Sequence, residues 1–150
     1  MVTSVVIIIL SLAMFVYWFR YSCILILESS WNEEQAQVVA VQNKLSFGSV
    51  NESLARAGTA EEMDRVKDLL DRDLGRVVSL LSKSPEVQEA GQSLECRMLV
   101  LDYQLMKAWY ALTRAIAGPR AQQALREMAS VVGYLAGEYG DHLATARNQA

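Results

Sequence analysis

The chain has 150 residues, of which 52% are hydrophobic and 21% are charged, and its formal net charge is −3. Basic and acidic residues alternate, so no basic face builds up that would bind nucleic acid. The two cysteines are too few for a disulfide framework. Few prolines and no alternating β-branched runs favour helices over strands. We expect an all-α protein, with a single N-terminal transmembrane helix followed by an antiparallel helical bundle of about three to four helices.

The N-terminal segment has the length and composition of a membrane anchor. Val2 to Phe19 contains 18 residues without a charge. As a helix it would be about 27 Å long, close to the hydrocarbon thickness of about 30 Å. A secretory signal peptide would need a basic start and a small-residue cleavage site, and the sequence has neither. We therefore predict an uncleaved anchor over residues 1–27 and a soluble helical bundle over residues 28–150.

An aromatic and arginine cluster follows the uncharged run. Such side chains gather at the bilayer interface, because their apolar bodies lie in lipid while their polar ends reach water. The residues that we predict at the membrane interface are Tyr17, Trp18, Arg20 and Tyr21.

Four consecutive aliphatic residues come after this belt and cover every side of one helical turn. In one arrangement the bilayer ends near Arg20, and protein covers the aliphatic turn. In the other the helix tilts, the span shifts towards Leu27, and Arg20 lies in the headgroups or pairs with a carboxylate. We favour the first, which gives the candidate partner contacts Ile24, Leu25, Ile26, Leu27 and Trp31.

The distribution of basic residues bears on orientation. No Lys or Arg precedes the span, and Arg20 follows it. The positive-inside rule then places the N-terminus outside and the C-terminal domain in the cytoplasm, as a single-pass protein of the bacterial inner membrane.

The middle of the chain carries clear start and stop signals. A helix is predicted over about residues 30–44, either separate from the anchor helix or continuous with it, with apolar residues at Trp31, Val38, Val41 and Leu45. A loop is expected over 46–53. "TAEE", Thr59 to Glu62, is a capping box that starts the next helix. The apolar stripe of that helix is Met63, Val66, Leu70, Leu74, Val77 and Leu81, and its charged side is expected to be solvated.

The following helix is expected to begin at Pro85, after Ser84 as N-cap, and to run to about Ala117. Its residues Val87, Gly91, Leu94, Met98, Leu101, Leu105, Ala108, Leu112 and Ala115 keep strict steps of four and three. The opposite side is also apolar, at Leu99, Val100, Tyr103, Met106 and Tyr110. Because it is apolar on two sides, we predict that this helix is the central one of the bundle.

Gly118 is predicted to close that helix and Pro119 to open the last one. The stripe of the last helix is Ala121, Leu125, Met128, Val132, Leu135 and Tyr139, and Ala129, Gly133 and Gly137 form a small-residue groove. The tail after Gly140 is expected to be frayed or partly helical.

Residues that could carry chemistry are scarce. His142 is the single histidine and is predicted to be exposed, which excludes Ser-His-Asp and histidine-rich metal sites. Glu95, Asp102 and Glu127 lack the spacing of a carboxylate-bridged metal centre. We therefore predict no enzyme, no catalytic residue, no cofactor and no metal site.

Two functional hypotheses remain. The first is a single-pass, membrane-anchored accessory or scaffold subunit that mediates protein–protein interactions in a larger membrane assembly, through protein partners or self-association, alongside the lipid bilayer. The second is a membrane-anchored ligand-binding or signalling bundle with a pocket lined by Met98, Tyr103, Met106 and Tyr110. The bilayer-length anchor and the aliphatic turn after it favour the first.

Overall fold

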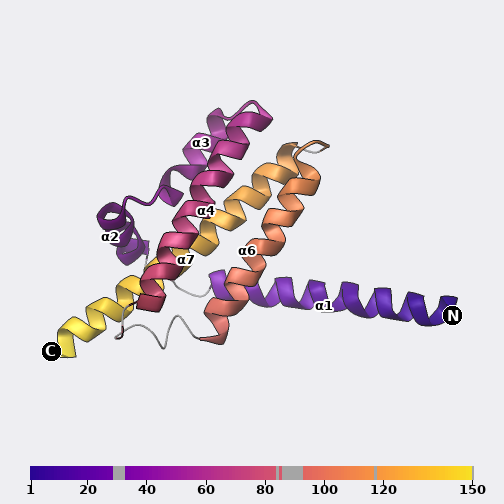
Figure 1. Cartoon of the computed structure of the whole chain (residues 1–150), viewed down its shortest axis with the longest axis horizontal. Coiled ribbons are helices and arrows are strands. Elements are labelled where there is room, and N and C mark those ends of the chain that lie inside the picture. The colour runs from indigo at the N-terminus through magenta and orange to yellow at the C-terminus, as the bar shows by residue number, and fades with distance from the viewer. Residues whose placement is uncertain (29–32, 84, 86–92, 117, 150) are drawn as a thin grey trace. The chain divides into compact units, whose positions relative to one another are not determined.

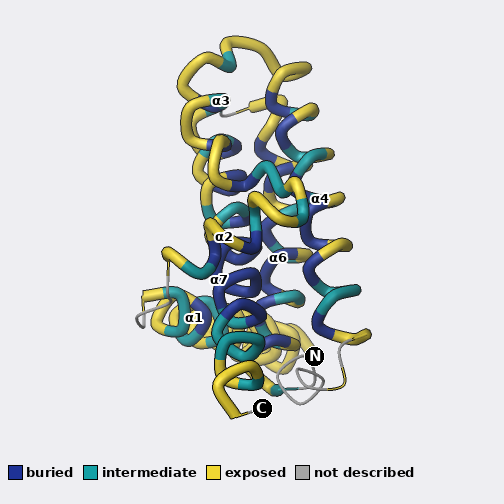
Figure 2. Tube along the Cα trace, turned by 90° about the vertical axis from the view of Figure 1, so that its left-hand side faces the viewer, coloured by how far each residue is buried: buried dark blue, intermediate teal, exposed yellow. Residues whose placement is uncertain are grey.

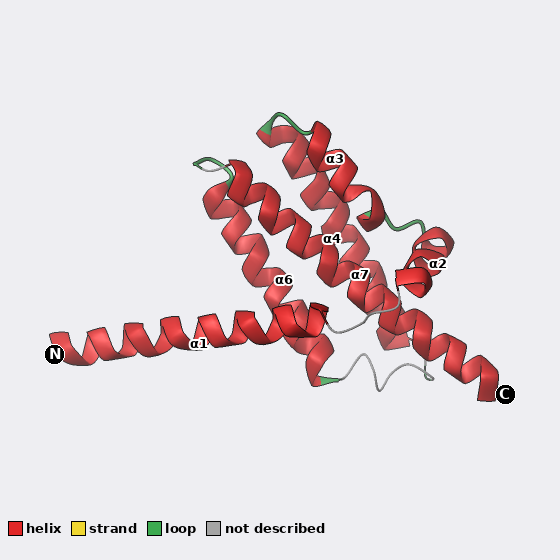
Figure 3. Ribbon diagram, turned by 180° about the vertical axis from the view of Figure 1, so that it is seen from behind, coloured by secondary structure: helices red, strands yellow, loops and turns green. Residues whose placement is uncertain are grey.

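The computed structural model describes residues 1–28, 33–83, 85, 93–116 and 118–149. Within those ranges the chain forms six α-helices and one short 3-10 helix, without a strand (Figures 1 and 3). This confirms the all-α prediction. The chain divides into two compact units, Met1–Ser30 and Trp31–Ala150.

The first unit contains the helix α1, Val2–Glu28. Its uncharged stretch has a mean hydropathy of 2.4, and it is long and apolar enough to cross a membrane, properties that a signal sequence shares. The helix continues without a break past Arg20.

The second unit is the bundle. Its helices are α2 (Glu33–Asn43), α3 (Val50–Arg56), α4 (Ala60–Lys83), α6 (Leu94–Thr113) and α7 (Gly118–Gln149), with the 3-10 helix η1 at Phe47–Ser49. The helices α4, α6 and α7 run alternately up and down (Figures 1 and 3). The predicted loop over 46–53 is therefore partly helical, because Phe47, Val50 and Leu54 are apolar at helical spacing and are buried.

The helix α4 follows the sequence prediction closely. All six residues of its apolar stripe are buried. The capping box also forms, because the Glu62 amide donates to Thr59 Oγ1 at 3.3 Å, and Glu62 Oε2 accepts from the Thr59 amide at 3.2 Å.

The central helix is α7, and the prediction that the preceding helix is central was wrong. The helix α7 contacts α2, α4 and α6, and Val131 to Gly137 are buried without interruption (Figure 2). All residues of its predicted stripe are buried. It takes the centre because glycines and alanines on this segment let neighbouring helices approach closely, whereas α6 carries large side chains on both sides. Of the two alternatives for the tail, the helical one is found, since α7 continues to Gln149.

The helix α2 packs on α7 through the side that carries Ala36 and Val39. Ala36 and Val39 are buried, whereas Val38 and Val41 are 46% and 80% exposed. The predicted stripe of α2 was therefore wrong for these two valines. Trp31 lies outside the described residues, as does any junction between α1 and α2.

Gly140 sets the distance between α2 and α7. A Cβ atom at this glycine would lie 3.1 Å from Gln35 Cβ, 3.1 Å from Val39 Cγ2 and 3.2 Å from the Gln35 carbonyl oxygen. We expect Gly140→Leu to lower the free energy of unfolding by about 1–3 kcal/mol, because the α2 backbone would have to move. Urea unfolding of the full chain in mild detergent, followed by circular dichroism, measures this.

The matched control is Gly75, on the exposed side of α4, where a Cβ would meet nothing within 4 Å. Gly75→Leu should raise the free energy of unfolding by about 0.5–1 kcal/mol, because it removes a glycine from a helix interior. Equal effects of the two substitutions would contradict close packing of α2 on α7 at Gly140.

Candidate functional site: an outward apolar face on α6

The helix α6 begins at Leu94, where Ser93 Oγ accepts the Cys96 amide hydrogen at 3.2 Å. The prediction of one continuous helix from Pro85 was wrong, because the backbone of Ser93 is not helical and α6 starts after it. The predicted N-cap Ser84 and residues 86–92 lie outside the described part. The helix ends at Thr113, and Gly118 is the first residue of α7 rather than a cap of α6.

The inner side of α6 is fixed by two tyrosines that reach α4. The Tyr103 hydroxyl donates to Asp71 Oδ1 at 2.9 Å, and the Tyr110 hydroxyl donates to Asp64 Oδ1 at 2.7 Å. Burial raises the pKa of both tyrosines, and the neighbouring carboxylates raise it further, so both hydroxyls stay protonated donors.

Two ion pairs also join α6 and the residue after it to the carboxylates of Asp71 and Asp64. Lys107 Nζ lies 2.8 Å from Asp71 Oδ2, and Arg114 Nη2 lies 2.8 Å from Asp64 Oδ2. Asp64 and Asp71 are therefore partly covered by α6. The charged side predicted to be solvated is exposed at Glu61, Arg65, Asp68 and Arg72. Together these contacts fix which side of α6 faces the bundle: Cys96, Leu99, Asp102, Tyr103, Met106, Tyr110 and Thr113 are buried.

The outer side of α6 is apolar. Leu94, Leu101 and Leu112 are 73%, 60% and 64% exposed. They belong to the stripe with steps of four and three, which was expected to face the bundle and instead points away from it. We call this surface the α6 seam, and it consists of Leu94, Met98, Leu101, Leu105, Ala108 and Leu112.

The α6 seam extends at its C-terminal end. Trp109 and Ile116, beside the seam, are also exposed. Single exposed apolar side chains are ordinary on protein surfaces, but a continuous row along a helix marks an interaction surface.

The interface residues predicted on α1 remain predictions. Tyr17, Trp18 and Tyr21 are exposed on α1, as expected of side chains that would meet lipid, and so are Ile24 and Leu25. His142 is half-buried, with its ring Nε2 lying 3.1 Å from Glu138 Oε1, which corrects the predicted solvent exposure.

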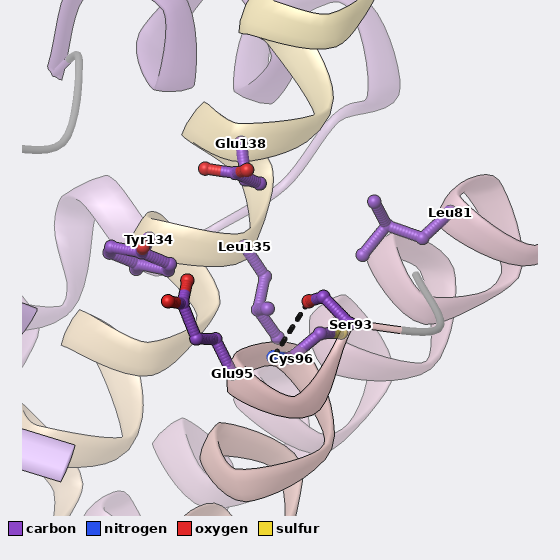
Figure 4. Close-up of a pocket in the computed structure, with 7 residues that line it drawn as sticks. All are labelled: Leu81, Ser93, Glu95, Cys96, Tyr134, Leu135 and Glu138. Atoms are coloured by element: carbon purple, nitrogen blue, oxygen red, sulfur yellow. Dashed lines mark hydrogen bonds between the residues drawn. The ribbon is translucent and has the colours of Figure 1, made fainter. Parts of the chain in front are cut away.

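A small pocket lies between α4, α6 and α7. Its lining residues are Leu81, Ser93, Glu95, Cys96, Tyr134, Leu135 and Glu138 (Figure 4). Its volume is about 10 Å³, room for about one water molecule. Burial and the nearby Glu138 charge raise the pKa of Cys96, so its thiol is protonated and unreactive at neutral pH.

Another pocket is an open groove of about 510 Å³ along α4, lined in part by Arg72, Arg76 and Asn43. Arg76 Nη1 donates to the Asn43 carbonyl at 3.4 Å and to the Lys44 carbonyl at 3.1 Å, so it closes the end of α2. Among the described residues, no group of three or more His, Cys, Asp and Glu side chains could hold a metal ion.

The residues of the ligand-binding hypothesis do not lie together. Tyr103, Met106 and Tyr110 are buried on the inner side of α6, while Met98 belongs to the α6 seam. Because both tyrosine hydroxyls are bound to α4, these side chains serve the core of the bundle.

Asp73 is a buried carboxylate on α4. Its Oδ2 accepts the Ser46 amide hydrogen, which ties η1 to α4, and its Oδ1 has no hydrogen-bond partner. Burial raises the pKa of Asp73, while the amides of Ser46 and Phe47 oppose that rise. Asp73 thus holds a loop in place.

Comparison of the chain with protein-family models, with curated proteins and with solved structures finds no match.

Proposed function

We propose that this chain is a single-pass, membrane-anchored accessory or scaffold subunit, and that the α6 seam receives an α-helix of a protein partner within a membrane assembly. The outward position of the α6 seam carries the proposal. The seam is a continuous apolar row whose spacing would suit packing against another helix. The opposite side of α6 already packs into the core of the bundle, so the seam is not needed there.

The energetics support an occupied seam. Full burial of a leucine side chain is worth about 1.5–3 kcal/mol. Leu94, Leu101 and Leu112 are each more than half exposed, so covering them would supply several kilocalories per mole, roughly 3–6 in total. We infer a helical partner, because helices that pack side by side insert their side chains between those of the neighbouring helix at steps of four and three.

The anchor completes the proposal. The helix α1 would be about 40 Å long, more than the roughly 30 Å of hydrocarbon that it must cross. Under the positive-inside rule, Arg20 after the uncharged run supports a cytoplasmic position for the bundle, in a protein of the bacterial inner membrane. Ile24 to Leu27 and Trp31 would add contacts to the same assembly.

Photo-crosslinking from the α6 seam tests the proposal. Benzoylphenylalanine is introduced at Leu101 or Leu112 of the full chain in native membranes, and at Gln123, on the exposed side of α7, as the matched control. We expect a covalent protein adduct from both seam positions and none from position 123. The double substitution Leu101→Glu and Leu105→Glu should abolish the adduct from position 112, because a charge cannot be buried unpaired.

Lipid adducts alone, or unreacted chain at both seam positions, would overturn the proposal. The melting temperature of each variant is measured beside the natural chain, so that a loss of adduct is read only from folded protein.

A further inference from the structure

The α6 seam has a composition that suits pairing with itself. We propose that its occupant is the α6 seam of a second copy of this chain, with the two α6 helices antiparallel. This inference rests on the proposed function and names the partner.

The spacing defines the pairing. Steps of four and three place the six seam residues at alternate a and d positions of a heptad repeat. In an antiparallel pair each layer joins an a position to a d position. The pairing then joins Leu94 to Leu112, Met98 to Ala108 and Leu101 to Leu105 of the second copy, and the same three layers repeat across the two-fold axis.

The side-chain sizes match this arrangement. Ala108 is the one small residue of the seam, and the antiparallel pairing places it opposite Met98, an unbranched side chain that adapts to fill irregular space. Parallel pairing would instead place Ala108 opposite Ala108 and leave a gap in the contact. The antiparallel order therefore packs more evenly.

The flanking charges permit self-association. On one side of the antiparallel pair, Arg97 lies opposite Ala111 of the second copy, and Gln104 lies opposite its own counterpart near the axis. On the other side, Glu95 lies opposite Trp109 of the second copy. These five residues are exposed, and none of these pairings joins like charges. Asp102, which the same register places opposite its own counterpart, is buried in the bundle and so does not flank the contact.

The basic side chains next to the seam argue against a lipid surface as the occupant. Interfacial helices present free Lys and Arg side chains to anionic headgroups. Lys107 and Arg114 are instead engaged with Asp71 and Asp64, each at 2.8 Å. Arg97 remains as one exposed basic side chain beside the seam, so the surface offers a single positive charge rather than the row that would hold a helix on a bilayer.

The size of the contact explains why anchoring matters. A helix of 20 residues is about 30 Å long and 10–12 Å wide, so its footprint is about 300 Å², below the roughly 800 Å² per partner of a standard interface. Such a pair would be weak in dilute solution. Confinement of both copies to one membrane raises their effective concentration and favours the dimer.

Disulfide trapping in liposomes that contain only the purified full chain tests the pairing. Single cysteines replace exposed residues in a Cys23→Ser, Cys96→Ala background, and the copies carry two tags of different size. With an added oxidant, we expect Gln104→Cys to form a dimer by itself. Arg97→Cys and Ala111→Cys should form a mixed dimer with each other, at twice the chain mass of 16.7 kDa, and little dimer alone. Gln123→Cys, on α7, is the control and should remain monomeric.

The results separate this inference from the proposed function. If the seam photo-adducts have a mass other than that of two chains and the cysteine variants stay monomeric, a second copy is excluded as the occupant of the seam. The proposal of a helix from another protein then remains. If Arg97→Cys and Ala111→Cys each dimerise alone and do not mix, the antiparallel order is wrong. Because removal of Cys96 could disturb folding, the mass of the Leu101 photo-adduct is also measured with both natural cysteines present, where twice the chain mass is required.

Discussion

Leu99→Ala should lower the free energy of unfolding by about 2–5 kcal/mol, whereas Leu101→Ala, two residues further along the same helix, should change it by less than about 0.5 kcal/mol. Leu99 is fully buried and Leu101 is 60% exposed. The same chemical change thus removes core packing at one position and leaves an exposed surface at the other. Both variants replace leucine by alanine on the same helix, two residues apart. The difference between their free energies of unfolding therefore reports which side of α6 faces the core.

Urea unfolding of the full chain in mild detergent, followed by circular dichroism, measures both variants. The comparison is made at low protein concentration, where weak self-association through the α6 seam is not populated. Similar losses at both positions, or a larger loss at Leu101, would mean that α6 is rotated and that its seam belongs to the core. The proposals built on the α6 seam would then fall together.

Asp73→Ala should lower the free energy of unfolding by about 1–3 kcal/mol, because the Ser46 amide would lose its acceptor. Asp73→Asn should cost less, since its carbonyl oxygen can still accept that hydrogen. Asp68→Ala is the control on the same helix, where a largely exposed carboxylate pairs with Lys67, and should change stability by less than about 0.5 kcal/mol.

The pH dependence of Asp73 has a definite sign. Its pKa is raised in the folded protein, so the folded state binds the proton more tightly than the unfolded chain. The stability of the natural chain relative to Asp73→Asn should therefore rise as the pH falls through the folded-state pKa towards the ordinary value of 3.8, and then level off. A relative stability that falls over this window would contradict the burial of an ionised carboxylate at this position.

The elements with one apolar side could be predicted from the sequence. The α4 stripe and its capping box are examples, because a single amphipathic face leaves one way to bury it. The helix α6 has two apolar sides, and hydrophobicity alone gives no reason to choose between them. The distinguishing signal was polar: Tyr103 and Tyr110 are seven residues apart, as are Asp64 and Asp71, which is the spacing of an antiparallel pair of tyrosine–aspartate contacts.

The position of α2 could not be predicted for a different reason. Hydrophobicity favours Val38 and Val41 over Ala36, yet the contact with α7 uses Ala36 and Val39. Because α2 lies close to Gly140, small side chains fit between the two helices better than large apolar ones. The sequence of α2 alone does not show this, since it depends on which helix packs against it. The long apolar helix α1, by contrast, is evident from composition and length alone.

The place of α7 in the chain has a consequence for biogenesis. Because α2, α4 and α6 all pack on a helix that is synthesised after them, the bundle cannot close while α7 is still being made. The contact between α2 and α7 joins residues about a hundred positions apart, and closing such a long loop slows folding. Under the proposed membrane anchoring, a nascent chain would commit α1 to the translocation machinery while the earlier helices still expose the faces that α7 later covers. During that interval chaperones, rather than native contacts, would keep those faces from aggregating.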